Sequence, residues 1–377
     1  MDRNPRMHPT HSHDCLPTLA TGREADAILF TEGDELYAAM IDSIENAQHE
    51  IALESYLFAD DEVGRRFADV LIKKIAAGVR VRLLLDAEGC RSRLSRKLAR
   101  HLADSGVEVR RFRPWRWGSP GKYWQRDHRK LLVVDGTTAF LGGFNIHRES
   151  SREFFGEHRW RDTHVRLGGS LARQAGECFN AFWSRDLHWE PQKSDSSGSM
   201  LMPNQTRACM HQLRCIYGTL FAEARSSIRI STPYFVPDHR TQNGLIEAAQ
   251  RGVEVSLLVP AKSDVPITRW AARAAYARLL ASGVKIYEYL PRMFHAKTAV
   301  IDGTWATIGT ANMDYRSLFL NYELNLITRD EQLCRQLQSH FSQDLSESAE
   351  IRPHAWTERK WTEYFYETIG WLGRRWL

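Results

Sequence analysis

The chain has 377 residues, of which 43% are hydrophobic and 26% are charged, and its formal net charge is +5. This length exceeds what one ordinary hydrophobic core supports, so we expect two domains, and the composition is that of a globular protein. The mild basic excess suits an acidic partner such as phospholipid or nucleic acid, without choosing between them.

Residues 1–26 form a polar tail that we expect to be disordered. The opening "MDRNPRMHPTHSHDC" has no apolar segment typical of a signal peptide, and no stretch of the chain has the roughly 18 uninterrupted apolar residues of a membrane-spanning helix. The histidines and cysteine of this tail have no second ligand group nearby, so we expect no metal site: His8, His11, His13 and Cys15. The six cysteines form no CxxC pair, which predicts reduced thiols in a cytosol-facing protein.

The first repeat is predicted over residues 27–190. Within it, "EIALESYLFADDEVGRRFADVLIKKIAAGVRVRLLLD" changes from a period of two to a helical period and back, which predicts a strand, a helix closed near Gly78 and a second strand. Another helix ends at "DSGVEVRRF". This order is typical of an α/β domain.

An aromatic and basic segment follows at 111–127, "RFRPWRWGSPGKYWQRD". Its rings are Trp115, Trp117, Tyr123 and Trp124, and its cations are Arg111, Arg113, Arg116, Lys122 and Arg126. Such a mixture suits the headgroup level of an anionic membrane. It also suits stacking on single-stranded nucleic acid, or a structural loop packed over a site, and of the three we favour lipid.

The motif "HRKLLVVDG" occupies 128–136 and introduces a short buried strand. His128 and Lys130 share one face of that strand, whereas Asp135 has the opposite parity and lies beside a glycine turn. The segment "GGFN" then ends at Asn145, whose amide is a hydrogen-bond donor.

After a Ser-, Pro- and Gly-containing linker predicted over 191–208, the same landmarks return in a second repeat over 209–350. "SIRISTPYFVPDHRTQNGLIEAAQRGVEVSLLVP" repeats the strand, helix and strand, and "HAKTAVIDG" supplies His295, Lys297 and Asp302. "GTAN" ends at Asn312. The recurrence in one order indicates an internal duplication.

Paired about a pseudo-twofold axis, the two motifs form a socket for a doubly oxygenated anion. One imidazole attacks phosphorus, and the other protonates the leaving alkoxide and then deprotonates the incoming alcohol. The two lysines and two asparagines stabilise the phosphate oxygens, so we expect no metal and no cofactor. The two aspartates are expected to accept hydrogen bonds from turns or loops.

Through these residues the sequence resembles the phospholipase D superfamily, whose mark is the paired HxK(x4)D motif. The resemblance extends from about Ile28 to Arg329. Within the superfamily, the sequence is similar in particular to bacterial cardiolipin synthases of the shorter type without N-terminal transmembrane helices. It rests on "ESYLFADDEVGRRF", "GVRVRLLLD", the two motifs, "WRDTHVRLGG" and "GTANMDYRSLFLNYELNL". The resemblance implies two duplicated α/β domains, each a mixed sheet flanked by helices, related by a pseudo-twofold axis with the active site between them.

The resemblance also implies a reaction and roles for residues. A phosphatidyl group would move from phosphatidylglycerol or phosphatidylethanolamine to phosphatidylglycerol, through a phosphohistidine on His128, with His295 as acid and base. Glu323 matches the family's acidic residue that orients an imidazole, and Asp162 of "WRDTHV" is expected to serve the other half. The catalytic set is then His128, Lys130, Asp135, His295, Lys297 and Asp302. The enzyme would lie on the cytoplasmic face of a bacterial inner membrane.

The C-terminal segment 351–377 is aromatic, basic and amphipathic. "WTERKWTEYFYETIGWLGRRWL" places apolar side chains at helical spacing, with charges that interrupt any spanning run. Together with Trp115, Trp117 and Trp124, its residues are the predicted lipid contacts: Trp361, Phe365, Trp371 and Trp376. A helix docked on the catalytic core fits the same pattern, and this alternative stays open.

Two other functions share the motif. Water competes with alcohol for the same phosphohistidine, so a phospholipase D or a nuclease would carry the same residues. The apolar area of the insertion and tail argues against a nuclease, and we expect no nucleic-acid partner. A catalytically silent binding module has no need for both intact His/Lys pairs.

Overall fold

The computed structural model describes residues 16–21, 27–115, 117–118, 123–191, 198–204, 207–359 and 361–373. The histidine and cysteine cluster of the N-terminal tail lies outside these residues, as do Arg116, Lys122 and Trp376. The prediction of a disordered tail does not hold for 16–21, because Leu19 is buried in the second repeat and its carbonyl accepts a hydrogen bond from Arg329 at 3.2 Å.

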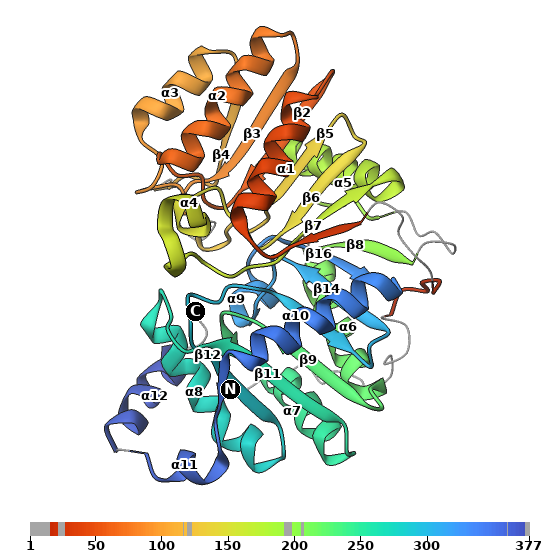
Figure 1. Ribbon diagram of the computed structural model, residues 1–377, viewed down its shortest axis with the longest axis vertical. Coiled ribbons are helices and arrows are strands. Elements are labelled where there is room, and N and C mark those ends of the chain that lie inside the picture. The colour runs from red at the N-terminus through yellow and green to blue at the C-terminus, as the bar shows by residue number, and fades with distance from the viewer. Residues whose placement is uncertain are drawn as a thin grey trace.

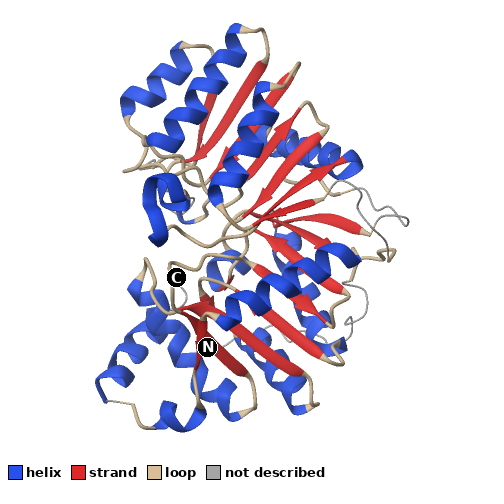
Figure 2. Cartoon of the chain, in the orientation of Figure 1, coloured by secondary structure: helices blue, strands red, loops and turns tan. Residues whose placement is uncertain are grey.

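Two mixed β-sheets form the framework of the molecule (Figures 1 and 2). The first has the order β1 (Ile28–Phe30), β7 (His164–Gly168), β6 (Thr138–Gly142), β5 (Leu131–Val134), β2 (Glu50–Ser55), β3 (Arg80–Asp86) and β4 (Glu108–Phe112). The second has the order β8 (Ser199–Asn204), β16 (Glu323–Thr328), β14 (Trp305–Gly309), β13 (Thr298–Ile301), β9 (Ser227–Ser231), β11 (Glu254–Pro260), β12 (Lys285–Tyr289) and β17 (Ser348–Glu350). Apart from β17, the two orders correspond strand for strand, in agreement with the predicted duplication.

Helices cover both faces of each sheet. In the first repeat, α1 (Gly33–Glu45), α2 (Glu62–Ala76) and α3 (Arg96–Asp104) pack on one face and α5 (Gly169–Trp183) on the other. In the second, α6 (Arg207–Glu223), α7 (His239–Gln250) and α8 (Pro266–Ala281) cover one face and α10 (Glu331–Ser346) the other. The short elements are α4 (Arg152–Phe155), α9 (Tyr315–Phe319), the 3-10 turns η2 (Arg148–Ser150) and η3 (Gly156–His158), and the strand pair β10 (Phe235–Val236) and β15 (Met313–Asp314).

The helices α2 and α7, which follow the corresponding strands β2 and β9, begin and end alike. Asp61 caps α2 by accepting a hydrogen bond from Gly64 N at 3.0 Å, and Asp238 caps α7 by accepting one from Thr241 N at 3.2 Å. Each helix ends before a glycine with positive φ, +84° at Gly78 and +90° at Gly252, where a side chain would be strained. These repeated signals set the length of the crossover helix and therefore the position of the next strand.

The two repeats share a hydrophobic core, so the space between them is rigidly framed. Leu141 and Val165 of the first sheet belong to one buried cluster with Ile308 and Leu324 of the second. Figure 1 shows β6 and β7 beside β14 and β16 at the middle of the molecule. As a result, β5 of the first repeat begins beside the second repeat, and β13 of the second repeat begins beside the first.

The segment predicted as a linker contains a strand. Residues 199–204 form β8, which pairs antiparallel with β16 and lies at the edge of the second sheet. Pro203 is compatible with this position because an edge strand tolerates a missing backbone donor. Serine, glycine and proline around the strand concealed it from sequence patterns.

The C-terminal helix α12 (Trp361–Gly373) docks on α8, with α11 (Pro353–Thr357) between it and β17. Gly370 allows the close approach, since a Cβ at this position would lie 2.4 Å from the backbone nitrogen of Ala271. Arg273 of α8 lies 3.3 Å from Glu363 and 3.8 Å from Glu367 of α12. No helix of the described residues is long and apolar enough to cross a membrane.

The cysteine prediction is right in part. Cys90, Cys178 and Cys334 are buried free thiols. Cys215 is disulfide-bonded, so the prediction of a reduced thiol is wrong for this residue. Irregular cysteine spacing contains no signal for a single bond of this kind.

Each motif aspartate fastens a turn between two central strands. Asp135 accepts hydrogen bonds from the backbone nitrogens of residues 48, 49 and 50 at 2.8 Å, and Asp302 accepts equivalent bonds from residues 225 to 227 at 2.8–2.9 Å. Both aspartates have positive φ, +50° and +53°. Burial opposes their ionisation, but the backbone donors hold the pKa of each carboxyl below its usual value.

We therefore expect Asp135→Ala to reduce the free energy of unfolding by about 1–2 kcal/mol, because three backbone donors lose one acceptor. Urea unfolding followed by circular dichroism would measure the change. Asp104→Ala, at the exposed end of α3, is the control and should alter stability little. Equal stability of Asp135→Ala and the wild type would contradict the turn assignment.

Candidate active site

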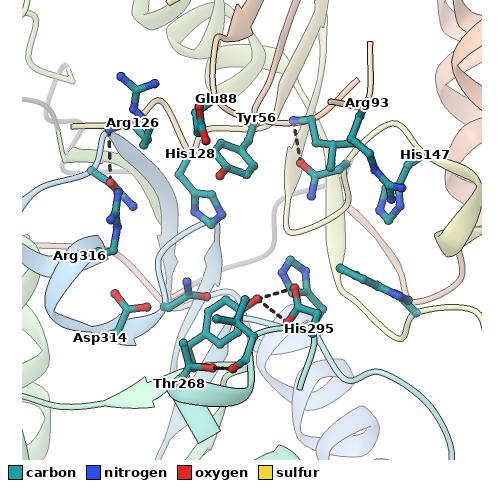
Figure 3. A pocket seen from close by; sticks show the side chains of 18 of the residues that line it. Tyr56, Glu88, Arg93, Arg126, His128, His147, Thr268, His295, Asp314 and Arg316 are labelled. Carbon is teal, nitrogen blue, oxygen red and sulfur yellow. Dashed lines mark hydrogen bonds between the residues drawn. The ribbon is translucent and has the colours of Figure 1, made fainter. Parts of the chain in front are cut away.

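A cavity of about 440 Å³ opens between the two repeats (Figure 3). Both motif histidines line it, and the remaining walls come from both repeats. The lining residues are Tyr56, Leu57, Glu88, Arg93, Tyr123, Trp124, Arg126, His128, Asn145, His147, Trp160, Tyr234, Asp264, Val265, Thr268, His295, Asn312, Asp314, Arg316 and Asn321.

The ring and the backbone nitrogen of His128, in the first repeat, are hydrogen-bonded to the second repeat. Its backbone nitrogen donates to the carbonyl of Tyr322 at 2.9 Å, and its Nδ1 lies 3.0 and 3.1 Å from the two carboxylate oxygens of Glu323. Glu323 also accepts hydrogen bonds from Thr310 at 2.5 Å and Ser317 at 2.7 Å. The carboxylate is therefore fixed before it orients the imidazole.

His295 of the second repeat is held in the same way by the first. Its backbone nitrogen donates to the carbonyl of Arg161 at 2.7 Å, and its Nδ1 lies 2.5 Å from Asp162 Oδ2. Arg161 is itself anchored by two hydrogen bonds to Asp344, at 2.9 and 2.8 Å. The acidic partners thus cross between repeats, so each carboxylate orients the histidine of the other repeat.

This crossing defines the chemistry available to each imidazole. A carboxylate at Nδ1 favours the tautomer with the proton on Nδ1, which leaves the lone pair on Nε2. Figure 3 shows both rings directed into the shared cavity. The two Nε2 atoms are the groups suited to attack or proton transfer there.

The lysines lie beneath the histidines and are fully buried. Lys130 Nζ donates to the carbonyl of His128 at 2.6 Å, and Lys297 Nζ lies 2.8 Å from His295 Nδ1 and 3.7 Å from Asp162. Burial lowers the pKa of Lys130 to about 7 and that of Lys297 to about 8. A bound anion would oppose this effect by favouring the charged ammonium groups.

Burial also favours neutral imidazoles. It lowers the pKa of His128, an effect that the Glu323 carboxylate opposes. Burial and the adjacent Lys297 together lower the pKa of His295 to about 4, although Asp162 acts in the opposite direction. Both rings are therefore mostly unprotonated near neutral pH, the state that a nucleophile or general base requires.

The two asparagines occupy equivalent places at the wall. Asn145 Oδ1 accepts from Leu57 N at 3.3 Å, and Asn312 Oδ1 has no hydrogen-bond partner within the described part of the chain. Both side chains are buried and line the cavity. The predicted pair is thus brought together with the histidines, whereas Asp135 and Asp302 fasten their turns and are not lining residues.

Sequence analysis missed several residues that flank the histidines. Tyr56 packs edge-on against His128 with ring centroids 5.1 Å apart, and Trp160 and Tyr234 lie 5.1 and 6.3 Å from His295. Tyr56 follows β2 and Tyr234 follows β9, the corresponding strands of the two repeats. Aromatic residues there have no spacing signal that separates a cavity wall from a core.

Two further cavity residues that the sequence did not predict occupy equivalent positions of the two repeats but differ in chemical type. His147 and Asp314 each lie two residues after a site asparagine. His147 lies 2.7 Å from Glu149, whose pKa falls to about 2 through this contact although burial opposes it, whereas burial raises the pKa of Asp314 to about 7. Extending the repeat alignment by two positions would have found both.

Of the predicted lipid contacts that the structure describes, one lines the cavity and most are exposed. Trp124 lines it and is 50% exposed, while Trp115 and Trp117 are 47% and 87% exposed. On α12, Trp361 and Phe365 are 77% and 58% exposed. Trp371 instead lies half-buried with its ring 6.3 Å from that of His239.

Within the described residues, no group of three or more His, Cys, Asp or Glu could hold a metal.

Comparisons with known proteins agree with this geometry. A family model described as "Cardiolipin synthase, PLD-like domain" matches residues 40–175 and 217–345. Cardiolipin synthase 2 of Bacillus anthracis is 35% identical over 95% of this chain and 74% of its own length. Probable cardiolipin synthase YwiE of Bacillus subtilis strain 168 is 33% identical over 87% of this chain and 67% of its own.

Solved structures share the fold. Phosphatidylserine synthase of Haemophilus influenzae Rd KW20 superposes with a TM-score of 0.72 at 16% identity, covering 96% of this chain and 97% of its own. Polyphosphate kinase of Porphyromonas gingivalis has a TM-score of 0.63 at 15% identity, covering 91% of this chain and 52% of its own. At such identities the likeness concerns architecture alone.

The crossing of carboxylates makes a specific prediction. Glu323→Gln removes the charge that favours protonated His128, so the pKa of His128 should fall while that of His295 stays unchanged. NMR titration of the imidazole Hε1 signals would measure both values, with His128→Ala and His295→Ala used for assignment. A shift confined to His295 would mean that each carboxylate serves its own repeat.

Proposed function

Because this chain belongs to the cardiolipin synthase family of the phospholipase D superfamily, we propose that it transfers a phosphatidyl group from one phospholipid to the glycerol headgroup of phosphatidylglycerol. The observation that carries this proposal is the pair of buried imidazoles facing one cavity, each oriented by a carboxylate of the other repeat. A reaction with a covalent intermediate needs one nucleophile and one proton carrier in reach of the same phosphorus.

The proposed sequence has two steps. An entering phosphodiester anion favours the form of His295 that is also protonated on Nε2. Nε2 of His128 then attacks the phosphorus of the donor lipid, and the bond to the headgroup oxygen breaks as this Nε2 proton of His295 passes to the leaving oxygen. The hydroxyl of phosphatidylglycerol then gives its proton to His295 and attacks the phosphohistidine, which releases His128 unchanged. Assignment of the nucleophile to His128 follows the family resemblance, and the symmetric geometry accommodates it.

The lysines and asparagines stabilise the oxygens around phosphorus. Lys130 and Lys297 are buried beneath the histidines, and burial lowers the pKa of both. An entering phosphodiester anion would favour their protonated forms and so gain two closely placed cations. Asn145 and Asn312 add neutral donors at the wall. Together, the two ammonium groups and the two amides suit the charge and the oxygens of one anionic phosphorus centre.

The donor and the location complete the proposal. Phosphatidylglycerol and phosphatidylethanolamine present the same phosphodiester to this socket, so we propose both as candidate donors. We propose a peripheral position on the cytoplasmic face of a bacterial inner membrane, with anionic phospholipid as the binding partner. Phospholipid substrates require such contact because their acyl chains stay in the bilayer.

One surface supports this placement. The exposed side chains of α12 include Trp361, Phe365 and Leu372, at 77%, 58% and 73% exposure. The helix beneath it, α8, begins beside the cavity, where Val265 and Thr268 are lining residues. An apolar face that adjoins the mouth of the cavity would bring the site to the level of the lipid headgroups.

The reaction is tested by mass spectrometry of lipids after the protein is mixed with liposomes. One sample contains phosphatidylglycerol alone and another adds phosphatidylethanolamine, and we expect cardiolipin from the wild type but not from His128→Ala. Comparing the two samples identifies the donor. Phosphatidic acid without cardiolipin would establish a hydrolase instead, and no lipid product would direct the search to nucleic-acid substrates.

The same preparations test the order of the histidines. With phosphorus-labelled donor lipid, His295→Ala should retain label on His128, because release of the intermediate needs the missing base. Label on His295 in His128→Ala would reverse the assignment. Peptide mapping under alkaline conditions, which preserve phosphohistidine, locates the label.

The exposed face of α12 can be tested without unfolding the helix. Serine at Trp361, Phe365 and Leu372 should weaken binding to anionic liposomes about tenfold or more, since each removes apolar area that would leave water. Turnover of a short-chain soluble lipid should stay unchanged. Ile28→Ser, at a 43% exposed position on β1, is the matched control, and equal loss in both assays would assign the face to the fold.

A further inference from the structure

A second cavity of about 430 Å³ lies beside the first and separate from the histidines. It is bounded by the edge strand β4, the end of α5 and the segment that follows β4. Tyr123 lines both cavities, and Tyr322, whose carbonyl accepts the backbone hydrogen bond of His128, forms part of the wall. The second cavity therefore adjoins the reaction site without containing its reacting groups.

Four arginines line this cavity, and none of its lining residues in the described chain is acidic: Arg110, Arg111, Arg113 and Arg185. Arg110 donates to the carbonyl of Trp183 at 2.9 Å and stacks 4.0 Å from its ring. Within the described residues, the side chains of Arg111 and Arg185 make no hydrogen bond or ion pair, and both residues are exposed. The exposed guanidinium groups of Arg111 and Arg185, beside two further arginines, suit an anion from outside.

The backbone supplies an independent observation. Four non-glycine residues in the described chain have positive φ, and two of them are the motif aspartates. The other two, Arg113 at +43° and Arg185 at +63°, both line this cavity. Arg185 follows the last turn of α5, where glycine is the favoured residue because it has no side chain to strain. Unusual backbone geometry of this kind gathers at functional sites.

The walls show which anion would fit. Phe112, Phe182 and Trp183 provide apolar surface, and the cavity is large enough for a headgroup with its glycerol carbons. Guanidinium groups bind phosphate oxygens in pairs. We propose that this cavity binds the phosphate and glycerol region of an anionic phospholipid, as a lipid site distinct from the catalytic one. The proposal goes beyond the transfer reaction and does not depend on it.

Calorimetric titration of the intact chain with monomeric dihexanoyl phosphatidylglycerol tests the proposal. We expect two bound lipids in the wild type. Arg111→Gln combined with Arg185→Gly should weaken one site about tenfold or more and leave the other, because two charged hydrogen-bond donors are lost. Lys130→Met combined with Lys297→Met should affect the other site. Arg100→Gln, an exposed arginine on α3, is the matched charge control.

A loss of lipid binding in the arginine variant can be distinguished from a loss of folding. Arg185→Gly introduces the residue that the helix end favours, so its melting temperature should equal or exceed that of the wild type while lipid binding falls. Unchanged binding in the double arginine variant would overturn the proposal. Equal affinity for inorganic phosphate would assign the cavity to free phosphate, and displacement of lipid by a short single-stranded RNA would assign it to nucleic acid.

The outcome is separable from that of the proposed reaction. Lipid binding that depends on Arg111 and Arg185 would stand even if the wild type formed no cardiolipin. Conversely, cardiolipin formation with unaltered binding in the double variant would leave the reaction and remove the second site.

Discussion

The hydrogen bond between each imidazole and a carboxylate of the opposite repeat is the constraint on which the rest of the structure depends. Glu323 lies 3.0 Å from His128, and Asp162 lies 2.5 Å from His295. The backbone nitrogen of each histidine also donates a hydrogen bond to a carbonyl of the other repeat. Neither repeat holds a complete oriented histidine by itself. The shared hydrophobic core between the sheets is therefore a requirement of the chemistry, because any slippage would misdirect both rings.

Such a site is costly to fold, and the surrounding structure offsets the cost with fixed partners. Buried charges are tolerated only when they are paired and hydrogen-bonded. Glu54 lies 3.0 Å from Arg129 with both side chains fully buried, and Arg161 is bound by two contacts to Asp344. These ion pairs lie directly behind the motifs. The same burial lowers the pKa values of both lysines, so stability and anion affinity are set by one low-dielectric environment.

How far the sequence predicted this arrangement depends on the range of each interaction. The βαβ units, the helix ends at Gly78 and Gly252 and the duplication were predictable, because their signals are local or repeated. The crossing of Asp162 and Glu323 was not, since sequence distance favours a partner in the same repeat. Strand β8 was hidden by its loop-like composition, and docking of α12 depends on Gly370 and on ion pairs formed only in the fold.

Duplication alone would give two equal histidines, yet transfer requires one nucleophile and one proton carrier. The difference must arise from residues that the repeats do not share. His147 and Asp314 occupy equivalent positions of the two repeats, one a base and the other an acid. Lys297 Nζ lies 2.8 Å from the ring nitrogen Nδ1 of His295, whereas Lys130 Nζ donates to the backbone carbonyl of His128. The two halves of the cavity therefore differ both in a flanking pair and in the placement of a motif lysine. A symmetric fold directs two imidazoles into one cavity, and a few unmatched side chains make their surroundings unequal.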